Sequence, residues 1–215
     1  MTCCVIVDYG SGNLHSAEKS FQRMAADRPF TEIRVTGDPE AVIRADMIVL
    51  PGVGAFAACR QALADRKGLV EALFEAARDR AVPFFGICVG MQMMATVGTE
   101  RGATCAGLDW IPGEVIPLAT NDVTLRLPHM GWNAFDSCAT EHPVFAGVAP
   151  GDHAYFVHSY HLRPRDPSHV LAQATHGETF AAAVGFDNIV GTQFHPEKSQ
   201  ATGLRIIGNF LGWRP

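Results

Sequence analysis

Cys88 has the sequence setting best suited to a nucleophile. It follows an apolar run and precedes a helix-like segment, within Phe85-Gly86-Ile87-Cys88-Val89-Gly90. This stretch fits G-x-C-x-G, the thiol form of the nucleophile elbow. A strand that turns sharply into a helix needs glycines at its flanks, and it places the thiol at a helix N-terminus that favours the thiolate. The Val89 N–H is then expected to face a developing oxyanion. On these residues alone, a buried cysteine between two packing glycines remains an alternative.

A base and a group to orient it are both present in the segment 191–197, which reads GTQFHPE. Residues i and i+2 of an extended segment point to the same side, so His195 and Glu197 are expected on one face. The Glu197 carboxylate would then meet the imidazole nitrogen that does not face Cys88, as a cysteine nucleophile requires. Pro196 has no N–H, which excludes an ordinary interior ladder. For His195 alone, a surface or core histidine is the alternative.

Two glycines also flank Val53 in the segment Leu50-Pro51-Gly52-Val53-Gly54, which ends another apolar run. Glycines allow a peptide to adopt positive φ or to reorient. Such a loop beside the elbow would offer a second N–H to the oxyanion. By itself, the segment equally fits an ordinary strand-ending turn.

Composition limits the other chemistries. Hydrophobic residues make up 47% and charged residues 18% of the 215 residues, and the net charge is −5. These values are typical of a globular protein, and with no basic patch we expect no nucleic-acid partner. The six cysteines have neither C-x-x-C nor zinc-ligand spacing, so we expect reduced thiols, no metal and no cofactor.

The apolar run at residues 3–7 is too short for a signal-peptide core. No apolar run reaches the roughly 18 residues that a membrane helix needs. The sequence therefore predicts a soluble, cytoplasmic protein with no membrane partner.

Apolar strands alternate with helical patterns in the first half of the chain. Strands are expected at residues 3–8, 32–36, 46–50 and 81–87. Helical patterns follow them at residues 14–24, at 56–80 with a break at Gly68, and at 90–97. This alternation predicts an α/β fold with a central, mostly parallel sheet flanked by helices.

The pattern changes in the second half. Short strand-like runs are expected at residues 122–127, 153–162, 169–175, 180–185 and 189–194, before a last helix at about 202–212. We interpret these strands as antiparallel additions and returning central strands. No linker or repeat divides the chain, so residues 1–215 are predicted to form a single domain.

Together these segments resemble the triad (class I) glutamine amidotransferases. GICVGMQ at 86–92 is similar to their nucleophile motif, and HPEKS at 195–199 to their base motif. Further segments narrow the resemblance to one subfamily: DYGSGN at 8–13, PGVGAF at 51–56, PHMGWN at 128–133, YFVHSY at 155–160 and FHPEKSQ at 194–200. The resemblance covers essentially the whole chain and implies the three-layer fold of that family. Val89 replaces the leucine usual after the nucleophile.

The resemblance also implies roles. Cys88 would attack the glutamine amide, His195 would shuttle the proton and Glu197 would orient His195. The oxyanion hole would comprise Val53, Gly54 and Val89, and glutamine would be held by Gly52, Gln92, Glu100, Ser159 and Tyr160. The partner would be a (β/α)8-barrel cyclase that takes the ammonia and docks against Asn13, Trp132, Tyr155 and Lys198. Asn13 as a helix cap and Trp132 as a core residue remain alternatives.

Two other functions stay open at this point. One is a free-standing cysteine hydrolase, and the other is the amidotransferase subunit of another synthase. If ammonia production depends on a second protein, the free-standing hydrolase is excluded. A catalytically silent binding subunit is disfavoured because Cys88, His195 and Glu197 are all intact.

Overall fold

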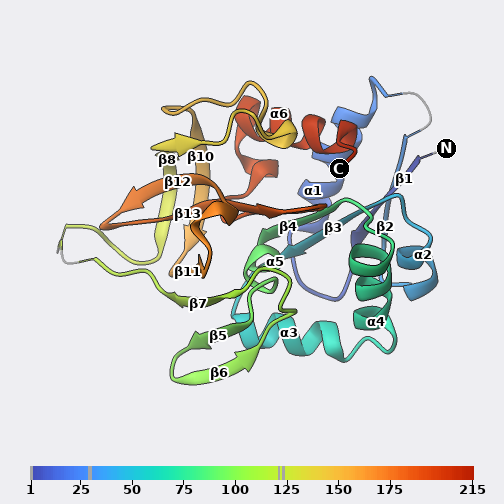
Figure 1. The fold of residues 1–215 in the computed structure, drawn as a ribbon, viewed down its shortest axis with the longest axis horizontal. Coiled ribbons are helices and arrows are strands. Elements are labelled where there is room, and N and C mark those ends of the chain that lie inside the picture. Colours follow the sequence, from blue (N-terminus) through green and yellow to red (C-terminus); the bar gives the residue numbers. More distant parts are fainter. Residues whose placement is uncertain (1, 29–30, 121, 123) are drawn as a thin grey trace.

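An eight-stranded sheet forms the centre of the computed structural model, which describes residues 2–28, 31–120, 122 and 124–215 (Figure 1). Its strand order is β2-β1-β3-β4-β14-β13-β12-β9. The strands are β1 (Thr2–Val7), β2 (Thr31–Thr36), β3 (Met47–Gly52), β4 (Phe84–Cys88), β9 (Ser137–Cys138), β12 (Val170–His176), β13 (Glu178–Phe186) and β14 (Ile189–Thr192). The first five strands in this order, β2, β1, β3, β4 and β14, pair in parallel. The pairs β14–β13, β13–β12 and β12–β9 are antiparallel, as the sequence predicts.

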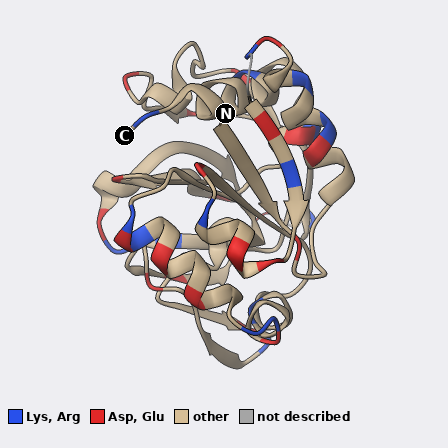
Figure 2. Ribbon diagram, turned by 90° about the vertical axis from the view of Figure 1, so that its right-hand side faces the viewer, with Lys and Arg blue, Asp and Glu red and all other residues tan. Residues whose placement is uncertain are grey.

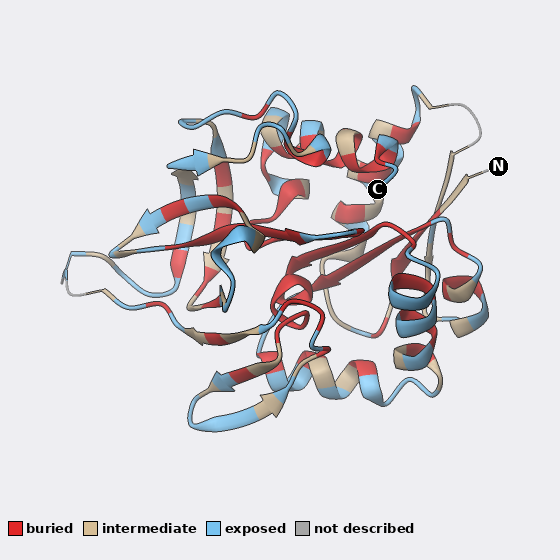
Figure 3. Ribbon diagram, in the orientation of Figure 1, coloured by how far each residue is buried: buried red, intermediate tan, exposed pale blue. Residues whose placement is uncertain are grey.

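The burial of these strands explains their composition. Every residue of β3, β4 and β14 is buried, as expected for parallel strands covered on both faces. Figure 3 shows this buried band through the middle of the molecule. At the open edge, β2 carries an ion pair between Glu32 and Arg34 at 2.8 Å. Figure 2 shows that most of the acidic and basic residues lie on helices and loops. Charges at a sheet edge oppose pairing with another chain.

Helices cover both faces of the sheet (Figure 1). On one side, α1 (Leu14–Ala25) packs with α6 (Gln200–Gly212). Phe210 of α6 contacts Phe21 of α1 at a ring distance of 6.3 Å and Phe85 of β4 at 5.1 Å. The other helices are α2 (Pro39–Ile43), α3 (Phe56–Ala64), α4 (Leu69–Phe74) and α5 (Val89–Gln92). The layers are those of the predicted three-layer architecture.

Two smaller sheets lie between β4 and β14 in the sequence. One has the order β11-β7-β5-β6 and the other pairs β10 with β8. Their strands are β5 (Val97–Glu100), β6 (Ala103–Ala106), β7 (Gly113–Pro117), β8 (His129–Ala134), β10 (His153–His158) and β11 (Tyr160–Pro164). In Figure 1, β7, β8, β10 and β11 lie around the β12–β13 end of the central sheet, and β5 and β6 lie beside α3. These strands carry several predicted site residues.

Three sequence expectations are wrong in this region. Within the predicted strand 122–127, residue 123 lies outside the described residues, and the described residues form a turn and bends instead of a strand. The next strand starts at His129. The predicted strand 153–162 is two strands in different sheets, because the chain bends at Ser159, where the His158 ring hydrogen-bonds to the Tyr160 carbonyl. The helix predicted at 90–97 ends at Gln92, and Val97 already belongs to β5.

The predicted break at Gly68 is confirmed. Gly68 has φ +81°, a conformation that favours glycine, and it separates α3 from α4. The end of the helical stretch is a π-helical turn, Glu75–Asp79. Remaining element boundaries differ from the expectations by a few residues.

Candidate active site

Cys88 ends β4 and immediately precedes α5. Its φ of 55° and ψ of −111° are unfavourable for a non-glycine residue, at a cost of about 1–3 kcal/mol. A Cβ on Gly86 would approach the Gly90 backbone to 2.8 Å, and a Cβ on Gly90 would overlap the Leu50 carbonyl oxygen. The two flanking glycines therefore permit the sharp strand-to-helix turn that the sequence predicts.

His195 follows β14, which neighbours β4 in the sheet. The two strands pair in parallel with Gly191 opposite Gly86, so they end at the same edge. The Nδ1 atom of His195 lies 2.9 Å from Glu197 Oε1, and both side chains are almost completely buried. The expected extended backbone is wrong, because Pro196–Lys198 form a 3-10 turn. Proline is favoured at the first position of such a turn. The turn still brings the Glu197 carboxylate to the His195 imidazole.

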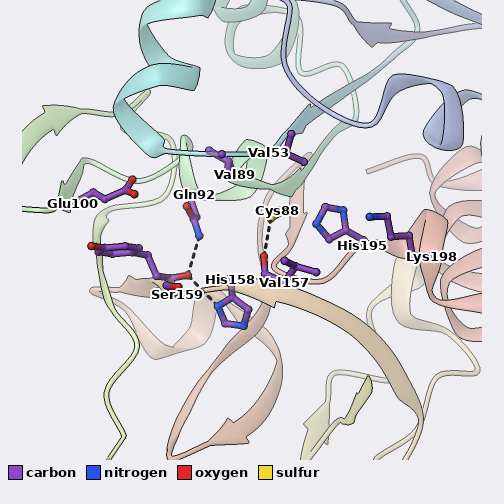
Figure 4. Close-up of a pocket in the computed structure, with 12 residues that line it drawn as sticks. Val53, Cys88, Val89, Gln92, Glu100, Val157, His158, Ser159, His195 and Lys198 are labelled. Atoms are coloured by element: carbon purple, nitrogen blue, oxygen red, sulfur yellow. Dashed lines mark hydrogen bonds between the residues drawn. The ribbon is translucent and has the colours of Figure 1, made fainter. Parts of the chain in front are cut away.

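The charge state of His195 follows from its neighbours. Burial by itself lowers the imidazole pKa, but contacts with Cys88 and Glu197 outweigh burial and raise the pKa of His195 to about 10. These contacts favour the imidazolium form of His195, which lies beside the thiol in Figure 4. Cys88 Sγ has weak contacts with the Val157 carbonyl oxygen at 4.0 Å and with Gln193 Nε2 at 3.8 Å.

A cavity of about 170 Å³ opens at Cys88 (Figure 4). Most of the residues predicted to surround glutamine line it: Val53, Gly54, Cys88, Val89, Gln92, Glu100, Ser159, Tyr160 and His195. Gly52 does not line it. A Cβ on Gly52 would come within 2.8 Å of Gly90 N and 2.9 Å of Tyr9 Oη, so this glycine allows the loop to pack on the elbow. Lys198, predicted at the partner interface, also lines the cavity.

Two of the cavity residues have fixed side chains. Glu100 Oε2 accepts a hydrogen bond from Phe56 N at 2.8 Å, at the start of α3. Gln92 Nε2 donates to the Tyr160 carbonyl oxygen at 2.9 Å and to Gln193 Oε1 at 3.0 Å. These bonds hold one carboxylate and one amide in place at the cavity wall.

The Val53 peptide is turned toward Ser11. Val53 N donates to Ser11 Oγ at 3.3 Å. The Val53 carbonyl oxygen accepts from Ser11 Oγ at 2.9 Å and from Cys59 Sγ at 3.2 Å. The predicted second oxyanion donor is therefore engaged in another hydrogen bond in this conformation.

The structure adds two residues that the sequence reasoning did not single out. Gln193, fully buried, connects Gln92 to Cys88. His158 lines the cavity and contacts the Tyr160 carbonyl. Gln193 lies two residues before His195, as His195 lies two residues before Glu197. This two-residue spacing is the signal in the sequence that could have identified Gln193. His158 had no comparable signal beyond its place directly before Ser159.

Three of the four predicted interface residues form one group. Trp132 on β8 lies opposite Tyr155 on β10, with ring centroids 5.9 Å apart, and Lys198 Nζ lies 5.9 Å from the Tyr155 ring centroid. Trp132 is 47% exposed, so the alternative of a core tryptophan is wrong. Asn13 stands at the N-terminus of α1 but makes no side-chain capping bond, so the capping alternative is wrong too.

Within the described part of the chain, no cluster of three or more His, Cys, Asp or Glu side chains is placed to hold a metal ion. The helices of the same residues are too short or too polar to cross a membrane.

Comparison with known proteins agrees with this geometry. The profile of the family described as glutamine amidotransferase class-I matches residues 5–212. A crystal structure of a glutamine amidotransferase superposes with a TM-score of 0.72 at 15% identity, covering 98% of this chain and 99% of that one. Another, from Thermotoga maritima, has a TM-score of 0.60 at 14% identity and covers 98% and 83%. At these identities the structures support the fold alone.

The chain belongs to the class-I glutamine amidotransferases. Within that family it groups with proteins named imidazole glycerol phosphate synthase subunit HisH. The protein of that name from Cereibacter sphaeroides is 57% identical over 98% of this chain and 99% of its own length. Those from Rhodospirillum rubrum and Caulobacter vibrioides are 55% and 52% identical, and each alignment covers at least 98% of both chains.

Proposed function

We propose that this chain is the glutaminase subunit of imidazole glycerol phosphate synthase, in histidine biosynthesis. It hydrolyses glutamine to glutamate and ammonia and passes the ammonia to a (β/α)8-barrel cyclase, which makes imidazole glycerol phosphate and AICAR. The observation that carries the proposal is the buried His195–Glu197 pair, 2.9 Å apart, beside Cys88 at the mouth of a strained strand-to-helix turn. The relatives named HisH favour this synthase over others.

The triad accounts for both halves of the reaction. The Cys88 thiolate attacks the side-chain amide carbon of glutamine, and the carbonyl electrons move onto oxygen. His195 gives its proton to the amide nitrogen, the C–N bond breaks, and ammonia leaves a γ-glutamyl thioester on Cys88. His195 then takes a proton from water as the water attacks the thioester, and glutamate leaves with the thiolate restored. Glu197 orients the imidazole and stabilises its charge.

The cavity supplies groups for each end of glutamine. Val89 N–H at the start of α5, together with the Val53–Gly54 peptide once it is reoriented, stabilises the oxyanion. Glu100 Oε1 and Gln92 Oε1 are acceptors for the polar groups of the substrate, on side chains that their other hydrogen bonds hold in place. The Ser159–Tyr160 backbone completes the wall. Gly52 contributes by letting the loop approach the elbow.

The partner surface is proposed to comprise Asn13, Trp132, Tyr155 and Lys198. The exposed Trp132 ring and the half-buried Tyr155 ring are of the kind enriched at protein interfaces. Lys198 touches both this group and the cavity, so the surface adjoins the site where ammonia forms. We place the protein, as one domain, in the cytoplasm.

The test is a glutaminase assay of the chain alone, with the cyclase, and with the cyclase and its ribonucleotide substrate. We expect ammonia production to depend on the cyclase. Full activity of the lone chain would favour a free-standing cysteine hydrolase instead. An unreactive complex with a folded chain would contradict the glutaminase assignment itself.

A further inference from the structure

The carbonyl oxygen of Tyr160 accepts two hydrogen bonds from buried side chains. Gln92 Nε2 lies 2.9 Å and His158 Nδ1 3.0 Å from this oxygen. Figure 4 shows the two bonds reaching it from different directions. A carbonyl oxygen has two lone pairs, and both are used here. The Tyr160 peptide at the cavity wall is therefore held in one orientation.

The His158 ring is itself fixed by a second histidine. His129 Nδ1 lies 3.0 Å from His158 Nε2. Because a carbonyl can only accept, His158 Nδ1 carries the proton, and Nε2 must accept from His129 Nδ1. Asn133 Nδ2 then donates to His129 Nε2 at 3.4 Å, and the same amide donates to the Thr175 carbonyl at 2.9 Å. Each ring has a single tautomer that fits this chain.

The surroundings keep both rings neutral. Burial is the main cause that lowers the pKa of His158 to about 3 and the pKa of His129 to about 4. His129 stacks on His176 at a ring distance of 4.1 Å and on Phe156 at 5.0 Å. Neutral rings are what the hydrogen-bond chain requires, since a charged His158 would have no acceptor for His129.

We propose that His158 is a positioning residue for glutamine, which holds the Ser159–Tyr160 backbone at the cavity wall, and that His129 fixes the tautomer in which it does so. The inference rests on the proposed function, because the cavity must be the glutamine site. His158 lines the cavity directly. The same bonds continue through Gln92 and Gln193 to Cys88, so the substrate wall and the nucleophile share one network.

The need to fill the hydrophobic core does not explain why His129 and His158 are histidines. A buried ring nitrogen without a hydrogen bond is costly, and apolar rings such as Phe156 and Phe180 already pack here. All four ring nitrogens of His129 and His158 are nevertheless bonded. By contrast, His161 is buried on the next strand with neither ring nitrogen hydrogen-bonded, and its Nε2 only approaches Glu178 Oε1, at 3.5 Å. The bonded pair is thus tied to a specific peptide rather than to the core in general.

The test compares two electrophiles on the full chain, with labelling of Cys88 read by peptide mass spectrometry. Diazo-oxo-norleucine has the shape of glutamine and needs the substrate wall, whereas iodoacetamide does not. His158→Phe keeps a ring and removes both nitrogens. Its half-saturating concentration of diazo-oxo-norleucine should rise about tenfold, as expected for loss of one hydrogen bond in the site. The iodoacetamide rate at Cys88 should not change.

Two further variants make the test specific. His158→Asn places an amide nitrogen where Nδ1 stood and should recover most of the affinity. His153→Phe alters an exposed histidine on the same strand and should behave as the wild type. A wild-type half-saturation in His158→Phe, no recovery in His158→Asn, or equal slowing by both electrophiles would each overturn the positioning role. If wild-type Cys88 is not labelled by diazo-oxo-norleucine at all, the proposed function fails first.

Discussion

Val53 donates its backbone N–H to the hydroxyl of Ser11, 3.3 Å away, and the same hydroxyl donates back to the Val53 carbonyl at 2.9 Å. The loop that should stabilise the oxyanion is therefore fastened to the segment preceding α1. That segment ends at Asn13, a residue of the proposed partner surface. Under the proposed interface, docking of the cyclase next to Asn13 would change which state of the Val53 peptide is favoured.

The lone chain should be nearly inactive as a glutaminase. One missing oxyanion donor costs on the order of 10²–10³ in rate. The cyclase and its nucleotide ligand should restore that factor by favouring the donating orientation, to the extent that they bind the two states differently. Steady-state ammonia release under the three conditions measures this. A lone chain that already turns over at the full rate refutes gating by the Val53 peptide.

Ser11→Ala should raise the activity of the lone chain. The substitution removes both bonds of the hydroxyl to Val53, and one hydrogen bond contributes about 1 kcal/mol, so the rise should be about tenfold or less. Activity with the cyclase should change little. Ser16→Ala on α1 is the matched control. A lower basal rate in Ser11→Ala would mean that the bond supports the active conformation instead.

Cys88→Ala should abolish glutamine hydrolysis without unfolding the chain. In other triad enzymes, loss of the nucleophile costs ~10⁶ in kcat. The complex supplied with free ammonia should still make product, because the cyclase does not use Cys88. Cys105→Ala, at a cysteine outside the cavity lining, serves as the control. Substantial hydrolysis by folded Cys88→Ala would exclude it as the nucleophile.

Glu197→Gln should be milder than His195→Ala. The carboxylate orients and stabilises the imidazolium, whereas the imidazole itself moves the proton. The acylation rates of the two variants in the complex decide the question. Equal losses, or a larger loss at Glu197, would show that the two roles are assigned wrongly.

Stability should fall as the pH drops from 7 to 5. His129 and His158 have folded-state pKa values of about 4 and about 3, below the ordinary 6.5, so the unfolded chain binds more protons in this window. Their contribution is present above pH 6.5 and is lost as the pH falls, by up to about 1.4 kcal/mol per proton and pH unit. Urea unfolding at several pH values measures the slope. His158→Phe should flatten it, and an unchanged slope in that variant would contradict the assignment.

The sequence predicts those parts of the site that depend on local backbone geometry. Gly86, Gly90 and Cys88 define a strand-to-helix turn within five residues, and the structure has that turn. The parallel order of the first strands follows from their apolar runs. Membership in the family follows from motifs of five to seven residues spread along the chain.

The remaining features depend on side-chain hydrogen bonds and on the pairing of strands that are distant in the sequence. The bend at Ser159 is spanned by a side-chain hydrogen bond of His158 that hydrophobic periodicity does not encode. The 3-10 turn at Pro196 replaces the expected extended segment, and Ser199 Oγ stabilises this turn by donating to the His195 carbonyl oxygen at 2.7 Å. The fixed tautomers of His129 and His158 require the register of β8 against β10, which places these residues opposite each other.

The insertion of two sheets between β4 and β14 also determines when the enzyme becomes competent during synthesis. Gln193 contacts Cys88 although 105 residues separate them in the sequence. The chain must therefore close a long loop, at a cost in entropy, before the parallel pairing of β14 with β4 can stabilise the fold. A chain still on the ribosome, with its last strand and α6 unmade, has the thiol but neither His195 nor Glu197. Under the proposed mechanism, a nascent or truncated chain cannot consume glutamine, and activity begins only with a nearly finished polypeptide.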